Sequence, residues 1–130
     1  MVDSDIDPVR AQVARLEALR HTLGRGAYVL DPGGALVEMT AGAEELLGWS
    51  SEELRGQNMH EAIHYLRADG SRYPGSECPL MGVLESGVDF GETDDTFVTK
   101  DGGMLSVAYV SSPVIVGDEI VGAVLAFWPR

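Results

Sequence analysis

The sequence predicts an α+β domain: a five-stranded antiparallel sheet with short helices on one face, preceded by an amphipathic helix. Three observations lead to this class. Apolar residues recur at helical spacing only near the start of the chain, strand-like segments flank glycine-rich turns before residue 40 and after residue 88, and short capped helical segments lie between them. Strands and helices are grouped rather than alternating, which favours α+β over α/β. The 130 residues suit one domain.

Residues 1–25 are predicted to form an N-terminal amphipathic helix, separate from the domain at 26–130. Asp7 and Pro8 form a helix-start signal, and Gly24 and Gly26 end the pattern. The stripe packs either on its own domain or on a second copy of the chain. We predict a dimer interface formed by the apolar positions Val9, Val13, Leu16 and Leu23.

The domain begins with a predicted hairpin, in which "AYVLD" and "ALVEM" flank the turn "DPGG". Two short helices follow. Thr40 can cap "AGAEELLGW", and Ser50 with Glu53 forms a capping-box pattern around "SEEL".

Residues 65–77 resemble a loop, and Pro79 favours the first turn of a helix that Gly87 closes. Three strands are then predicted, within 89–100, 104–116 and 120–128. In the last strand we expect Leu125 and Phe127 on the outer face, where a helix could cover them.

Charge and composition exclude several classes. The net charge of −12 lies on residues 26–130, because acids and arginines balance in residues 1–25. Such an acidic body repels phosphate backbones, which argues against nucleic-acid binding. The longest apolar runs are shorter than a membrane span. Cys78 is the single cysteine and the start of the chain has no secretory signal pattern, so we expect a cytoplasmic protein.

An ordered set of motifs resembles the Per-Arnt-Sim (PAS) sensory domains over about residues 26–128. The motifs are, in chain order, Asp31-Pro32-Gly33-Gly34, Thr40, Ala43 to Leu47, Gly48-Trp49-Ser50-Ser51-Glu52-Glu53-Leu54-Arg55-Gly56-Gln57-Asn58, Lys100-Asp101-Gly102, Ser111-Ser112-Pro113-Val114 and Ile120-Val121-Gly122-Ala123-Val124-Leu125-Ala126-Phe127. A bacterial variant is also matched, at His64, Asp69-Gly70, Tyr73-Pro74 and Glu77-Cys78-Pro79.

The resemblance implies a sensory or protein-interaction module of signal transduction, without catalytic activity. It also implies partners: a second copy of the chain, and a signalling partner or an effector domain outside this sequence. Thr40 replaces the family's usual asparagine, and Trp128-Pro129-Arg130 replaces its usual D-I-T after the last strand.

A second hypothesis is a small zinc hydrolase, because His60-Glu61-Ala62-Ile63-His64 matches H-E-x-x-H. On a helix, His60 and His64 would share a face, with Glu61 placed to activate a metal-bound water. A peptidase needs a third ligand, and the candidates downstream are acids such as Glu77 or Glu85. We therefore expect no catalytic residue and no metal ligand here.

The resemblance suggests two candidate cofactors, flavin and haem. In flavin-binding members a reactive cysteine falls at Met59, and polar flavin contacts fall at Phe97, Val107 and Val124, whose side chains cannot hydrogen-bond a flavin. This argues against flavin. Haem ligated by the Cys78 thiolate remains an open alternative, a redox or gas sensor, because Cys78-Pro79 resembles the dipeptide of some haem-thiolate proteins.

The interior is expected either to be a filled core or to hold a small, largely apolar molecule between sheet and helices. In the second case Tyr109 would be the polar group that orients the ligand. The predicted ligand-binding residues are Met59, Ile63, Leu84, Phe97, Val107, Tyr109 and Val124.

Overall fold

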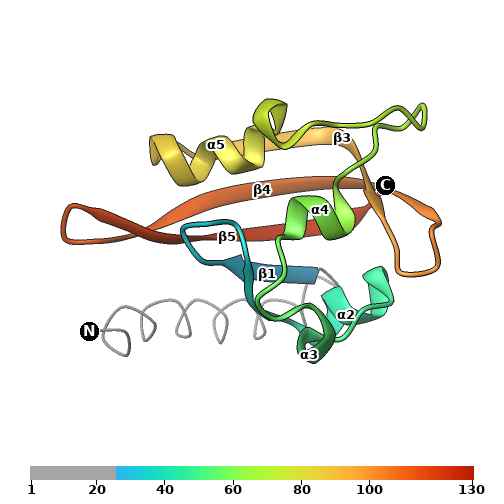
Figure 1. The fold of residues 1–130 in the computed structure, drawn as a ribbon, viewed down its shortest axis with the longest axis horizontal. Coiled ribbons are helices and arrows are strands. Elements are labelled where there is room, and N and C mark those ends of the chain that lie inside the picture. Colours follow the sequence, from blue (N-terminus) through green and yellow to red (C-terminus); the bar gives the residue numbers. More distant parts are fainter. Residues whose placement is uncertain (1–25) are drawn as a thin grey trace.

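The computed structural model describes residues 26–130, and the predicted helix and dimer interface at 1–25 lie outside the described residues. Its centre is one antiparallel sheet with strand order β2-β1-β5-β4-β3, seen in Figure 1. The strands are β1 (Gly26–Leu30), β2 (Leu36–Met39), β3 (Phe90–Val98), β4 (Met104–Val116) and β5 (Glu119–Pro129). The predicted α+β class and five-stranded sheet are confirmed.

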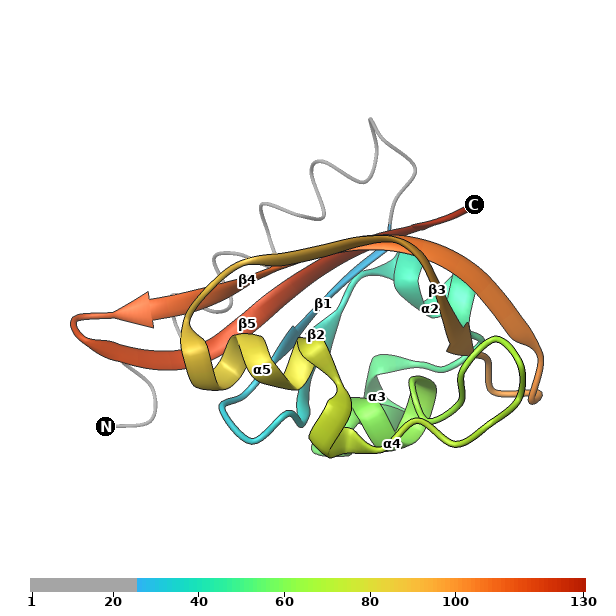
Figure 2. The same ribbon diagram turned by 90° about the horizontal axis from the view of Figure 1, so that it is seen from above.

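Short helices fill the connection between β2 and β3 and cover one face of the sheet (Figure 2). They are α2 (Ala41–Leu47), α3 (Ser51–Leu54), α4 (Met59–Ile63), the 3-10 turn η1 (Gly75–Glu77) and α5 (Pro79–Ser86). Within the described residues, none of these helices is long and apolar enough to cross a membrane.

The β1–β2 hairpin turns where "DPGG" predicted it. Asp31 Oδ1 accepts hydrogen bonds from the amides of Gly33 and Ala35, both at 2.9 Å. Gly34 has a φ of 90°, and a Cβ there would lie 2.5 Å from Cε of Met81 on α5. The positive φ therefore requires glycine, whereas the nearby methyl group is the flexible end of the Met81 side chain and could move.

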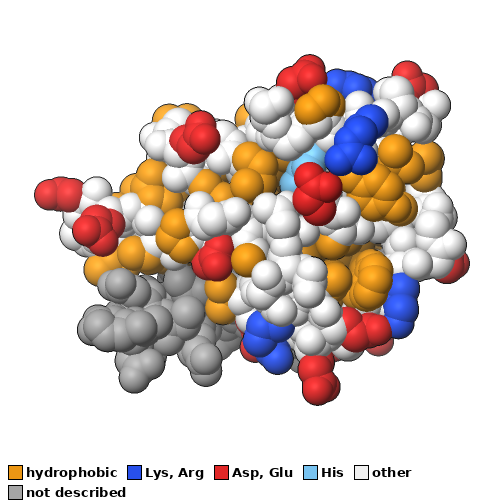
Figure 3. Space-filling view, in the orientation of Figure 1, with side chains coloured by type: hydrophobic (Ala, Val, Ile, Leu, Met, Phe, Trp, Pro, Cys, Tyr) orange, Lys and Arg blue, Asp and Glu red, His pale blue; other side chains and the backbone are white. Residues whose placement is uncertain are grey.

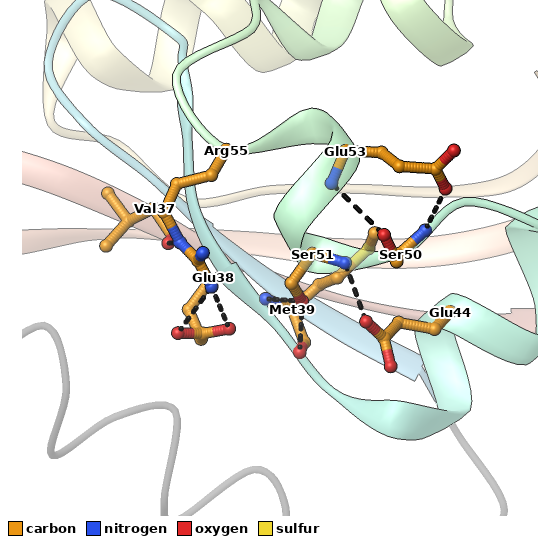
Figure 4. Close-up of polar contacts among 8 residues, drawn as sticks. All are labelled: Val37, Glu38, Met39, Glu44, Ser50, Ser51, Glu53 and Arg55. Carbon is orange, nitrogen blue, oxygen red and sulfur yellow. Dashed lines mark hydrogen bonds and ion pairs between the residues drawn. The ribbon is translucent and has the colours of Figure 1, made fainter.

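The predicted capping residues start the helices. Thr40 Oγ1 accepts from the amide of Ala43 at the start of α2 and from the amide of Ala27 in β1. Figure 4 shows the reciprocal pair at α3, where Ser50 Oγ accepts from the Glu53 amide and the Glu53 carboxylate accepts from the Ser50 amide. These contacts satisfy amide groups that a helix start leaves without intrahelical partners.

The main core lies between the helices and the sheet, and the sheet faces of β5 are the reverse of those expected. Leu125 and Phe127 are buried in this core, at 2% and 0% exposure, so their predicted outer position is wrong. Val124 instead packs on the opposite face with Val29 and Val114, so its predicted place in the interior is also wrong. The register explains both results, because Leu125 pairs with inward-facing Tyr28 and Val124 pairs with Val29.

Candidate functional site

The first four residues of HEAIH lie on the five-residue helix α4, and His64 is the capping residue that follows it. Asn58 caps the start of α4, because its Oδ1 accepts from the Glu61 amide at 3.0 Å. His60 is 5% exposed, and His64, the residue that ends α4, is 2% exposed. Glu61 is exposed and forms an ion pair with Arg72 at 3.5 Å. The two histidines therefore face the interior, while the glutamate between them faces solvent.

His64 is held from both sides of its ring by residues distant in the sequence. Its Nδ1 lies 3.3 Å from Sγ of Cys78, which is buried at the residue before α5. Its Nε2 donates a hydrogen bond to Oδ2 of Asp95 on β3 at 3.0 Å. His64 thus joins the first turn of α5 to the sheet.

The sheet side of this arrangement continues to β4. The hydroxyl of Tyr109 donates to the same Oδ2 of Asp95, at 2.8 Å. The Tyr109 ring stacks on Phe97, with centroids 5.8 Å apart and planes 6° from parallel. A continuous polar relay, which we define as Cys78, His64, Asp95 and Tyr109, therefore crosses the core from the helices to β4.

Burial and pairing compete in setting the charges of this relay. Burial alone lowers the pKa of His64, but the hydrogen bonds to Asp95 and Cys78 outweigh it and raise that pKa to about 9. Burial raises the pKa of Asp95, but the hydrogen bonds from His64 and Tyr109 prevail and lower it. Burial and the Asp95 hydrogen bond both raise the pKa of Tyr109. At neutral pH the relay holds an imidazolium–carboxylate pair.

His60 lies beside the relay, and its hydrogen bonding and its pKa differ from those of His64. Its Nε2 lies 2.7 Å from the backbone carbonyl of Tyr73, a contact in which the nitrogen is the donor. Its Nδ1 is buried and has no hydrogen-bond partner among the described residues. Burial lowers the pKa of His60. One ring nitrogen of His60, one of His64 and the sulfur of Cys78 all lie within 4.8 Å of one another.

The predicted ligand-binding residues, apart from Val124, meet in one core cluster: Met59, Ile63, Leu84, Phe97, Val107 and Tyr109. Around the histidines this core leaves a cavity of about 10 Å³, room for a single water molecule at most. Larger hollows, of 400 to 540 Å³, are open to the surface. Whether the interior takes an apolar ligand stays a prediction, but in this conformation side chains fill the space.

Neither of the two cofactors weighed from the sequence fits this interior. A haem ring on Cys78 would need the space that His64 occupies at 3.3 Å from Sγ, in a cavity of about 10 Å³. At the two flavin-contact positions that face the core, Phe97 and Val107 are fully buried and apolar. Figure 3 shows a small area of histidine surface on this face, bordered by hydrophobic side chains and by an acidic and a basic side chain.

The sequence did not reveal the polar relay. It singled out His60, His64 and Cys78 one by one, and it did not single out Asp95. The available signal for Asp95 was its position two residues before Phe97, which places both side chains on the same face of a strand. An acid on an inward-facing strand position needs a buried partner. Which partner it finds depends on where the connection between β2 and β3 folds back.

Comparisons with known proteins bear on the fold and on the family separately. Curated proteins yield no match. Among solved structures, a PAS domain from Colwellia psychrerythraea aligns with TM-score 0.65 at 20% identity, over 82% of this chain and 86% of its own. The PAS domain of nitrogen regulation protein NR(II) from Vibrio parahaemolyticus aligns with TM-score 0.65 at 21% identity, over 88% and 96%. The LOV domain of a blue-light activated histidine kinase from Erythrobacter litoralis aligns with TM-score 0.65 at 15% identity, over 82% and 95%.

These identities are low, so the solved structures establish the fold alone. The family model described as the PAS fold matches residues 14–128, which is most of the sequence and includes the whole polar relay. That match extends upstream of the predicted boundary at residue 26. The chain belongs to the PAS family.

Proposed function

We propose that this PAS domain is a sensory module without catalytic activity, which responds to a change at its buried polar cluster and transmits that change through the sheet to a partner. PAS domains in general are sensory modules of signal transduction rather than enzymes, and the Erythrobacter relative is part of a sensor kinase. The finer proposal concerns which residues of this chain respond to the signal.

The observation that carries the proposal is the hydrogen-bonded path from Cys78 through His64 and Asp95 to Tyr109. Hydrogen bonds in a low-dielectric core polarise one another, and leaving one member unpaired is costly. A change at the helix end of the path must therefore alter pairing at the strand end. This path couples α4 and α5 to β3 and β4, which are distant in sequence.

The arrangement also supports a non-catalytic role for HEAIH. A hydrolase would need the Glu61 carboxylate beside the histidines, as the general base for a metal-bound water. Here that carboxylate is exposed and paired with Arg72, while His60 and His64 are buried. The hydrolase hypothesis would require α4 to turn about its axis.

The partners we propose are a second copy of the chain and an effector, either a separate protein or a domain beyond this sequence, and we place the protein in the cytoplasm. The interface assigned to Val9, Val13, Leu16 and Leu23 remains part of this proposal. The face of the sheet away from the helices is suited to receive an apolar helix, because β4 exposes Val110 and Val116 there, at 50% and 37%.

Hydrogen-exchange mass spectrometry of the Asp95→Asn variant tests the transmission. At labelling times short relative to global unfolding, we expect faster exchange in α5 and β4 as well as in β3, while β1 and β2 keep the parent's protection. The matched control is Asp94→Asn, which changes the neighbouring exposed carboxylate, paired with Arg130 at 3.0 Å.

Two results would contradict the proposal. Faster exchange confined to β3 would mean that the relay does not couple the helices to the sheet. Equal acceleration in all five strands would mean that Asp95 contributes only to global stability.

A further inference from the structure

We propose that His60, His64 and Cys78 form a binding site for one monovalent copper ion. The inference rests on the proposed sensory function, because it names the ligand of the same buried cluster. Its three donors come from α4 and from the residue that precedes α5.

The donor atoms are already close to coordination distances. One ring nitrogen from each histidine and Cys78 Sγ lie within 4.8 Å of one another, and Sγ is 3.3 Å from Nδ1 of His64. Ligands that sit about 2.0–2.3 Å from a metal ion lie about 3.3–3.8 Å from each other. A movement of about 1 Å by one side chain would therefore complete a three-coordinate site.

Each histidine is oriented as metal-binding histidines are. Nε2 of His60 is committed to the Tyr73 carbonyl, and Nε2 of His64 is committed to the Asp95 carboxylate. Such hydrogen bonds from Nε2 leave Nδ1 as the metal-binding nitrogen, and at His64 the ion would displace the proton that Nδ1 carries in the metal-free imidazolium. Nδ1 of His60 is the independent sign of a missing ligand, because it is buried, in a side chain only 5% exposed, without a partner among the described residues.

The surroundings favour monovalent copper over zinc. Two thioether side chains, those of Met59 and Met81, line the same cavity as the histidines and Cys78. Thiolate, imidazole and thioether together are a soft ligand set, which suits Cu(I), and thioethers are not usual ligands of zinc.

The volume of the cavity also favours monovalent copper over zinc. A volume of about 10 Å³ holds an ion and leaves no space for coordinated water. Cu(I) accepts three protein ligands without water, while a three-ligand zinc site keeps a water in the fourth position. The site would therefore bind an ion without becoming a hydrolytic centre.

Anaerobic titration of the full chain with Cu(I), against a chromogenic Cu(I) chelator, tests the proposal. We expect one Cu(I) per chain, and at least 10-fold weaker competition by Zn(II). The Cys78→Ala and His60→Phe variants should each lose at least 100-fold in affinity, while Glu61→Gln, in the same segment but exposed, should bind as the parent does. Circular dichroism of each metal-free variant checks that it folds.

A second measurement on the parent does not depend on any variant. X-ray absorption of the copper-loaded protein should show one sulfur and two imidazole nitrogens at bonding distance. A second sulfur, from the thioether of Met59 or Met81, would also agree with the proposal. Undiminished Cu(I) binding by Cys78→Ala, a coordination shell without imidazole, or preference for Zn(II) would each overturn the assignment. Failure here with the expected exchange pattern in Asp95→Asn would leave the sensory proposal standing, since that test uses metal-free protein.

Discussion

His64 Nε2 donates a hydrogen bond to Asp95 Oδ2 at 3.0 Å, across 31 positions of sequence. The His64 side chain is 2% exposed and that of Asp95 is 15% exposed, so water screens the pair poorly. Removing one member of a buried ion pair leaves the other charge without compensation, which costs far more than losing a surface pair. We derive four predictions from this contact and from others in the fold, and a fifth from the sequence of residues 6–23.

The Asp95→Asn substitution should lower the free energy of unfolding by about 2–4 kcal/mol, because His64 loses its carboxylate partner. Urea denaturation of the metal-free protein measures the loss. The neighbouring Asp94→Asn change, at an exposed ion pair with Arg130, should cost less than about 1 kcal/mol. Equal costs for the two variants would mean that the buried pair contributes no more than the surface pair.

The Tyr109→Phe substitution should cost about 1 kcal/mol, since it removes one hydrogen bond to Asp95 and keeps the ring. The aromatic stack with Phe97, at 5.8 Å, should survive. A Tyr109→Leu variant should cost clearly more, because it loses the stack as well. Denaturation curves in which the two variants coincide would rule out a separate contribution from the ring.

Gly26 should tolerate no side chain, because a Cβ there would lie 2.9 Å from the backbone of Ala43 and from Phe127. We expect Gly26→Ala to destabilise the protein by about 1–3 kcal/mol through overpacking. Gly82→Ala is the matched control, since a Cβ at Gly82 in α5 meets nothing within 4 Å. That change should stabilise the protein by about 0.5–1 kcal/mol. The same sign for both in thermal unfolding would contradict this prediction.

Glu53 should make stability depend on pH in the acidic range. The hydrogen bond from Lys100 and that from the Ser50 amide lower the pKa of Glu53 in the folded protein. A lowered pKa stabilises the fold above the unfolded-state value, and this contribution is lost as the pH falls through the folded-state pKa. The parent should therefore be more stable than Glu53→Gln at pH 7, and the difference should shrink as the pH falls through the acidic range. A difference that stays constant over that range would show that charge at Glu53 is not the cause.

The predicted helix at residues 6–23 should mediate self-association. Light scattering should show that Val13→Glu and Leu16→Glu reduce the apparent mass from dimer to monomer, because each places a charge in an apolar stripe. Arg15→Glu, which lies outside the stripe, is the control and should leave the mass unchanged. If both stripe variants keep the parent's mass, this helix is not the interface.

Local structure was readable from the sequence because its causes are local. Thr40, Ser50 and Glu53 cap helices through contacts within three residues, and "DPGG" closes its turn within five. Pro79 begins α5 and Gly87 ends it, as predicted, and Gly87 adopts a left-handed conformation. Together with the ordered motifs, these signals were sufficient to predict the five-stranded antiparallel sheet and the PAS family.

The faces of β5 could not be read in this way. Residues 120–127 are apolar at nearly every position, so alternation selects neither face. Pairing between Tyr28 and Leu125 decided that Leu125 and Phe127 face the helices and that Val124 faces away. Register is a property of two strands, and one strand's sequence does not contain it.

The sequence by itself determined the fold class, the order of its elements and the candidate residues His60, His64 and Cys78. Only the tertiary structure decided that these three side chains meet and that His64 also reaches Asp95. His64 contacts Cys78 across 14 positions of sequence and Asp95 across 31. The length of the intervening chain does not determine how far apart these side chains lie. Their convergence depends on the packing of α4 and α5 against β3, and burial then turns separate polar residues into one coupled cluster.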